Sequence, residues 1–308
     1  MAKIWKIDED YDCVRLDRFL RKKYSQVPLG AIMRAIRKGK VTVNGEKTDP
    51  SYRLYRGDEI SVPFEDPAKL KPSLNVADKP LEVIFMDENV LIINKPAGLL
   101  SQPASKEDDS VVNRALNLIN KTKGGFIPTP AHRLDRNISG VMALALNPRS
   151  LRALTAMFRN RRVAKKYLAV VRGRLSGEGV IEAPLERDER FLKTVVNKRE
   201  GKRSATRYMS LSAGNHASLV ALEPITGRPH QLRVHLSYIG HPIVGDVKYG
   251  DGGGKEAGRP MLHAYSLEIF GNDLSYLAGK KFCAPLPADL AGVINLFDLS
   301  LDTIIGML

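Results

Sequence analysis

A stretch without regular hydrophobic periodicity, from about Pro63 to Pro80, divides this 308-residue chain into two unequal parts. It contains four prolines, which lack a backbone donor and interrupt both helices and strands. The apolar residues have helical spacing before this stretch and mostly strand-like spacing after it. We therefore predict a small module over residues 1–64, a linker over 65–80 and a larger domain over 81–308.

The first module is predicted to be a small α/β unit with a dense basic surface. Apolar residues at helical spacing around Phe19 and Ile36 predict two amphipathic helices, and the Asn44-Gly45 pair after an alternating run predicts a hairpin. Ten basic residues and two acids lie between positions 15 and 47. Such a surface suits a polyanion. The side chains expected to bind it are Arg15, Arg18, Arg34, Arg37, Lys38 and Lys40.

The larger domain is predicted to be α+β. Strands are expected over 81–86, 90–94, 141–146, 166–171, 207–212 and 217–223. One helix is expected from the Asn147 cap to about Phe158, and another from Pro229 to Ile239, closed by Gly240. Because helices do not alternate strictly with strands, we expect a largely antiparallel mixed β-sheet with flanking helices rather than a doubly wound sheet.

The charge balance points to a polyanionic partner. Lysine and arginine number 48 against 34 acids, a formal net charge of +14, and nucleic acid is the commonest such partner. Charge alone leaves an anionic membrane surface open. No apolar run reaches the roughly 18 residues of a membrane-spanning helix, and the N-terminus shows no apolar signal core. We expect a cytoplasmic monomer that does not bind membranes. Cys13 and Cys283 are too few for a disulfide framework or a metal knuckle, and are expected to be small buried residues.

The segment over 131–140 places one carboxylate, Asp135, between Arg133 and Arg136 in a loop that leads into a predicted strand. An isolated Arg-Leu-Asp-Arg sequence is most often a surface ion pair. Its position at the entry to the sheet also makes Asp135 a candidate catalytic group.

Two further segments carry possible chemistry. Tyr167 lies in a strand that follows a strongly basic stretch, where a lone tyrosine usually packs in the core. Arg228 precedes a predicted helix, and Arg233 lies within the first two turns of that helix. Arginines at a helix N-terminus suit an anion or a carboxylate partner.

Together and in this order, these segments resemble the RluA-type family of pseudouridine synthases, from about Leu81 to Pro287. The first module resembles the alpha-L RNA-binding domain found in ribosomal proteins. The segments that carry the family resemblance are His132-Arg133-Leu134-Asp135 with Ser139-Gly140, residues 227–235 with 240–243 and Gly245-Asp246, Asn94-Lys95-Pro96-Ala97-Gly98, and Leu262-His263-Ala264.

The resemblance implies isomerisation of uridines in large-subunit ribosomal RNA to pseudouridine, by base flipping and without a cofactor. Asp135 corresponds to the catalytic aspartate and Tyr167 to the tyrosine that lies against the target base. Arg233 corresponds to the arginine that pairs with the aspartate, and we expect two parallel hydrogen bonds between them. By analogy, Arg133 would occupy the gap that the flipped base leaves. Ile138 and Pro229 stand where the family usually has hydroxyl residues.

Two other classes of protein compete with this one, and a metal site must also be considered. A non-catalytic RNA-binding ribosome-assembly factor would have the same charge pattern, and a glycosidase-like hydrolase would normally need a pair of carboxylates where this loop has one. A metal site is suggested by three histidines within twelve residues, His230, His235 and His241. The first two would lie on different helix faces, with no cysteine or nearby acid to complete a ligand set. We therefore expect no metal.

Overall fold

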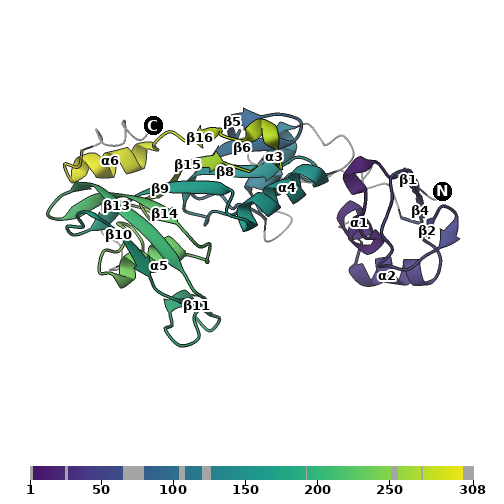
Figure 1. Cartoon of the computed structure of the whole chain (residues 1–308), viewed down its shortest axis with the longest axis horizontal. Coiled ribbons are helices and arrows are strands. Elements are labelled where there is room, and N and C mark those ends of the chain that lie inside the picture. The colour runs from purple at the N-terminus through teal and green to yellow at the C-terminus, as the bar shows by residue number, and fades with distance from the viewer. Residues whose placement is uncertain are drawn as a thin grey trace.

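The computed structural model describes residues 3–24, 27–64, 80–103, 108–119, 126–191, 193–250, 256–271 and 273–300. Within them the chain forms two parts, each with its own sheet and core (Figure 1). The linker expected over 65–80 lies, except for Pro80, outside the described residues.

The N-terminal part is a four-stranded antiparallel sheet, in the order β1-β4-β2-β3, packed against two helices. Its hairpin turns at Asn44 and Gly45, which both have positive φ, 53° and 83°, as predicted for a two-residue turn of this composition. Leu16, Phe19 and Ile36 are buried in the core, which confirms the predicted apolar helix faces. Its elements are β1 (Lys3–Lys6), η1 (Glu9–Tyr11), α1 (Leu16–Lys23), α2 (Leu29–Arg37), β2 (Thr42–Val43), β3 (Glu46–Lys47) and β4 (Glu59–Val62).

The larger part is built on a ten-stranded sheet whose main path runs β10-β13-β14-β9-β15-β8-β6-β5. Every pair in it is antiparallel except β8 with β15, so the predicted α+β fold is confirmed. Strands β11 and β12 form a separate hairpin that projects from the sheet (Figure 1). The elements are β5 (Glu82–Met86), β6 (Val90–Lys95), α3 (Val111–Leu118), β7 (Thr129–Pro130), β8 (Ser139–Ala145), α4 (Pro148–Arg159), β9 (Val163–Arg172), β10 (Glu178–Glu182), β11 (Leu185–Asp188), β12 (Lys193–Val196), β13 (Ala205–Ala213), β14 (Ala217–Pro224), α5 (Gln231–Tyr238), β15 (Leu262–Ile269), η3 (Ser275–Leu277), β16 (Lys281–Cys283) and α6 (Ala288–Leu296).

Both faces of the sheet are buried near β6 and β8. Val90 and Ile92 point into one apolar cluster, which contains residues of α4, whereas Leu91 and Ile93 point into another, which contains residues of α3. The side chains of successive strand residues point to opposite faces of the sheet. Because both faces are buried here, every residue of these runs is apolar, instead of every second one. The central strands are therefore rigid supports for the loops at their ends.

Gly140 lies where β8 comes very close to the backbone of β15. It has φ 119°, and a Cβ at this position would lie 2.1 Å from the carbonyl oxygen of Ala264 on β15. Only glycine fits between two backbones this close. It allows β8, which begins directly after the loop carrying Asp135, to pair with β15.

Two predictions need correction. Helix α5 begins at Gln231 rather than Pro229, because His230 adopts the left-handed conformation with φ 55° and cannot belong to the helix. Cys13 is exposed and Cys283 is half-buried, although both were expected to be buried, and Cys13 too has a positive φ, 59°.

Candidate active site

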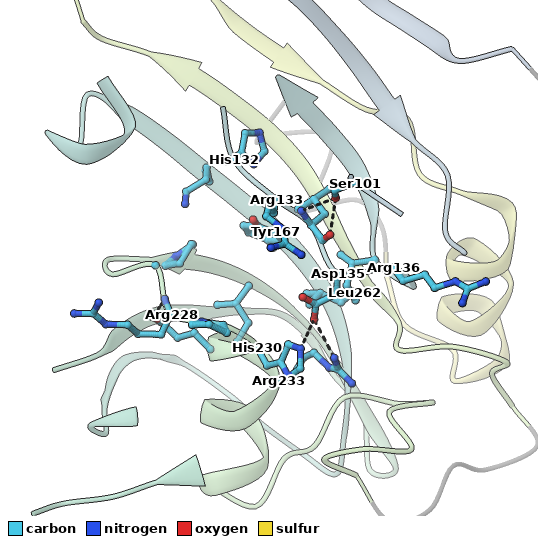
Figure 2. Close-up of a pocket in the computed structure, with 18 of the residues that line it drawn as sticks. Ser101, His132, Arg133, Asp135, Arg136, Tyr167, Arg228, His230, Arg233 and Leu262 are labelled. Carbon is cyan, nitrogen blue, oxygen red and sulfur yellow. Dashed lines mark hydrogen bonds and ion pairs between the residues drawn. The ribbon is translucent and has the colours of Figure 1, made fainter. Parts of the chain in front are cut away.

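A pocket of about 920 Å³ opens at the ends of several central elements of the sheet (Figure 2). Its walls come from the loop before β8, from Tyr167 on β9, from the segment between β14 and α5, and from Leu262 at the start of β15. This volume suits a single nucleotide or other small group. Residues far apart in the sequence meet here because β9 and β8 both flank β15.

Asp135 faces Arg233 across the pocket. Arg233 Nη1 donates a hydrogen bond to Asp135 Oδ2 at 2.9 Å, although 98 residues separate them in sequence. The Asp135 side chain is 33% exposed and that of Arg233 only 11%, so the carboxylate remains accessible while the guanidinium is held. Arg136, the sequence neighbour of Asp135, points away from it (Figure 2) and donates from Nε to the carbonyl oxygen of Gly98 at 3.0 Å.

A second carboxylate, Asp246, holds Arg233 from the buried side. Arg233 Nε and Nη2 donate to its two oxygens at 2.6 and 2.7 Å, and its side chain is 1% exposed. The two parallel hydrogen bonds expected between Arg233 and Asp135 are therefore made to Asp246 instead, and Asp135 receives one. The role of Asp246 in holding Arg233 was not predicted from the sequence, although Gly245-Asp246 is one of the segments that carry the family resemblance.

The loop carrying Asp135 is pinned to residues 95–101. The Lys95 ammonium is buried and donates to the carbonyl oxygens of Pro96, Leu99 and Arg136 at 2.7–2.9 Å. Ser101 Oγ donates to the Leu134 carbonyl and accepts from the Leu134 amide. Because backbone atoms on both sides of Asp135 are bonded, the backbone that carries its carboxylate is held in place.

Tyr167 forms the floor of the pocket. It lies on β9, opposite Ala264 on β15 and Leu222 on β14, and is 8% exposed. Burial, and then the neighbouring charge of Asp135, raise the pKa of Tyr167, so its hydroxyl stays protonated at neutral pH.

His132 is a structural member of the pocket wall. Its Nε2 accepts a hydrogen bond from the Ala143 amide at 3.1 Å, and its ring packs on Phe158 with centroids 4.7 Å apart. Burial, and then the charge of Lys165, lower the pKa of His132 to about 3. It is therefore neutral at physiological pH and has no free nitrogen lone pair for proton transfer.

The pocket is strongly basic. One carboxylate, Asp135, lines it together with six cationic side chains, which favours a polyanionic ligand. Arg228 Nε and Nη2 each donate a hydrogen bond to the carbonyl oxygen of Arg203 at 3.4 Å. The six are Arg133, Arg136, Lys165, Arg187, Arg228 and Arg233.

The basic residues of the N-terminal module differ in their availability. Arg15 is engaged by Asp17 through two hydrogen bonds, of 3.1 and 2.7 Å. Lys23 is buried beside the rings of Trp5 and Tyr11 rather than exposed. Of the six residues expected to bind a polyanion, the five with exposed side chains are Arg18, Arg34, Arg37, Lys38 and Lys40.

The three neighbouring histidines do not converge. His235 is buried between Thr206 Oγ1 and the Ala183 carbonyl, and His241 Nδ1 contacts the Arg172 carbonyl. Within the described segments, no three His, Cys, Asp or Glu side chains gather where they could hold a metal ion. Among those same residues, no helix has the length and apolarity that a membrane crossing requires.

Comparisons with known proteins agree on one class. Residues 89–238 match the model of the RNA pseudouridylate synthase family, and residues 14–60 match the S4 domain. The chain is 37% identical over 288 residues to ribosomal large subunit pseudouridine synthase D of Borreliella burgdorferi, covering 90% of this chain and 87% of that protein. It is 36% identical over 286 residues to ribosomal large subunit pseudouridine synthase C of Haemophilus ducreyi, covering 87% and 88%.

The fold leads to the same class. The solved structure of human RNA pseudouridylate synthase domain containing 1 superposes with a TM-score of 0.62 at 27% identity, covering 75% of this chain and 95% of that one. An S4 module joined to this mixed sheet defines an RNA-modifying enzyme. The chain belongs to the RNA pseudouridylate synthase family, in its RluA-type branch, and is an isomerase.

Proposed function

We propose that this enzyme converts specific uridines of large-subunit ribosomal RNA to pseudouridine in the cytoplasm, as a monomer and without a cofactor. The observation that carries the proposal is the Asp135–Arg233 pair, which places one oriented carboxylate in a basic pocket. The names of the two bacterial relatives support large-subunit RNA as the substrate.

The proposed reaction is redox-neutral. The bond from ribose C1′ to uracil N1 breaks, the uracil turns, and a new bond joins C1′ to C5. C5 then loses its proton while N1 gains one, so that substrate and product have the same composition. Asp135 acts as the nucleophile or the base in this sequence, and the hydrogen bond from Arg233 keeps its oxygen directed into the pocket. Tyr167 offers a flat face against which the uracil rests.

The target base must leave its stack to reach Asp135, at a cost of a few kcal/mol. The basic side chains around the pocket offset this cost by binding phosphates on either side of the flipped nucleotide. Arg133 is exposed beside the opening and is the proposed occupant of the vacated space.

The proposed division of labour follows the two parts of the fold. Residues 81–308 carry the chemistry, and residues 1–64 bind RNA through Arg18, Arg34, Arg37, Lys38 and Lys40. Arg15 contributes once its local pair with Asp17 is exchanged for a phosphate. Arg228 contacts RNA at the rim of the pocket.

The test is to map pseudouridine across ribosomal RNA from cells with and without the protein, and from cells that carry Asp135→Asn or, as control, Glu178→Gln on the exposed edge strand β10. We expect a small set of large-subunit sites to be lost in the deletion and Asp135→Asn strains and kept in the control. Sites kept with Asp135→Asn would overturn the role of Asp135. If the deletion strain keeps every pseudouridine but makes defective ribosomal subunits, the protein is an assembly factor. If the purified enzyme releases free uracil, it is a hydrolase.

A further inference from the structure

His230 is a second side chain that faces the carboxylate of Asp135. Its Nε2 lies 3.7 Å from Asp135 Oδ2, and its side chain is 18% exposed. The residue immediately precedes α5 and adopts a left-handed backbone conformation, with φ 55°. This conformation is uncommon for a residue other than glycine, so the surrounding structure must hold it in place.

The other ring nitrogen of His230 is bound by Tyr249. Nδ1 lies 2.5 Å from the Tyr249 hydroxyl, and the two rings meet edge to face with centroids 5.4 Å apart. The same hydroxyl accepts a hydrogen bond from the backbone amide of Thr194 on β12 at 3.0 Å. Tyr249 is itself anchored, because its amide donates to Asp246 and its ring lies 4.9 Å from the Arg233 guanidinium carbon.

Together with the charge of Asp135, these contacts favour one arrangement of protons. The Thr194 amide can only donate, so the hydroxyl oxygen accepts from it and its own hydrogen is free to point at His230 Nδ1. Nδ1 is then the acceptor nitrogen and Nε2 carries the hydrogen, which faces the Asp135 carboxylate. The opposite tautomer would place a nitrogen lone pair against a negative charge.

The choice of tautomer has an effect only if the His230 imidazole is neutral, since a charged imidazole has a hydrogen on both nitrogens. Burial lowers the pKa of His230, Arg233, Lys248 and Arg187 lower it further, and Asp135 opposes them. The imidazole is therefore neutral at physiological pH, and only one of its nitrogens can present a hydrogen to Asp135.

We propose that His230 is a positioning residue for Asp135, presenting Nε2–H to its carboxylate, and that the Tyr249 hydroxyl holds His230 in that tautomer. Arg233 and His230 would then hold Asp135 Oδ2 from two sides, leaving Oδ1 for the substrate. The contribution of His230 to turnover rests on the function proposed above, whereas its tautomer does not.

The tautomer can be read directly from the imidazole nitrogen shifts of His230 in the ¹⁵N-labelled full-length protein, assigned by their disappearance in His230→Gln. We expect a shift typical of an unprotonated nitrogen at Nδ1 and of a protonated one at Nε2, with this preference lost in Tyr249→Phe. A protonated Nδ1 in the wild-type protein would overturn the proposal, whether or not the enzyme turns over.

Kinetics test the consequence for catalysis. Tyr249→Phe and His230→Gln should each lower kcat about 5- to 10-fold with unchanged RNA affinity, the size expected from one hydrogen bond. The kcat of the double variant should lie within about twofold of that of His230→Gln, because both changes break the same chain of contacts. His230→Ala, which has no donor, should be slower than His230→Gln.

The matched control is Tyr238→Phe, the same substitution on an exposed tyrosine at the end of α5. It should keep the wild-type kcat. Multiplicative effects in the double variant, or a wild-type kcat for Tyr249→Phe, would show that the two residues do not act through Asp135. If the wild-type protein fails to convert uridine at all, the proposed function fails and the tautomer measurement still decides the geometry.

Discussion

The guanidinium of Arg233 is bound through two hydrogen bonds, of 2.6 and 2.7 Å, to Asp246. Since Asp246 is almost fully buried, the direction of Arg233 is set by the interior of the protein before any RNA arrives. The remaining Nη1 is left for the partly exposed carboxylate of Asp135. The arginine thus links a buried carboxylate to the one that faces the pocket.

Arg233→Lys is expected to lower kcat by about 100-fold or more, with RNA binding nearly unchanged. A single ammonium cannot make two parallel bonds to Asp246 and also direct a third at Asp135. Single-turnover rates should be compared with those of Arg207→Lys, which changes an exposed Arg207–Glu223 pair in the same way. A rate within a few-fold of wild type would show that charge alone is sufficient.

Asp246→Asn is expected to lower kcat by about 10-fold or more. It should also lower the free energy of unfolding by about 3 kcal/mol, the usual cost of removing one partner of a buried ion pair. The amide can accept only with its one oxygen, and its NH₂ group would face the guanidinium. Urea unfolding and single-turnover rates on the same sample separate the two effects, with Glu223→Gln on the exposed pair as control. Wild-type kcat in a destabilised Asp246→Asn protein would limit Asp246 to folding.

Removal of residues 1–64 is expected to weaken RNA binding and flatten its salt dependence while leaving some catalysis. For every phosphate that the shortened protein no longer binds, the slope of log affinity against log salt should fall by about one. Because Arg34, Arg37 and Lys38 are exposed, replacing these three by Gln in the intact chain offers a milder variant. Equal affinities and slopes for all three proteins, measured on a large-subunit RNA fragment, would show that these charges do not contact RNA.

Stability is expected to fall as the pH drops below about 6.5. Burial lowers the pKa of His132 to about 3 and that of His263 to about 4, whereas both would titrate near 6.5 when unfolded. Between these values the unfolded chain binds more protons, so acid favours unfolding. His132 alone would contribute up to about 2 kcal/mol between pH 7.5 and pH 5.

This contribution can be measured by urea unfolding of His132→Gln at the two pH values, since glutamine can still accept from the Ala143 amide. The variant should lose less stability on acidification than the wild-type protein. His216→Gln, at an exposed histidine, is the control. Identical losses in all three proteins would mean that His132 is not kept neutral by the fold.

Local signals predicted local structure well. The Asn44-Gly45 turn formed as expected, and Asn147 caps α4 by accepting from the Ser150 amide, with Pro148 in the first turn. These features depend on neighbouring residues only. Strand β15 was not predicted, because the polar residues His263, Ser266 and Glu268 interrupt its apolar pattern.

The site was predictable only in part, because its geometry depends on contacts across the chain. The proximity of Asp135 and Arg233 followed from the family resemblance, and the structure has them in contact. Asp246 was not recognised as a partner, since an aspartate after glycine in a loop usually serves a turn. The left-handed conformation of His230 was not predicted either, because histidine has no strong preference of its own for this conformation and the surrounding structure must hold it. The catalytic roles remain predictions.

Strand β15 follows both β8 and β9 in the sequence, yet it lies between them and joins them in the sheet. A nascent chain that stops before Leu262 therefore has one unpaired edge on each of these two strands, and unpaired edges invite association with other chains. Because β15 joins β8 to β9, the loop that carries Asp135 and the strand that carries Tyr167 are expected to come together only once β15 has paired with both. Assembly of the active site is therefore expected to be a late step in folding, which follows the pairing of β15 with the strands on both of its sides.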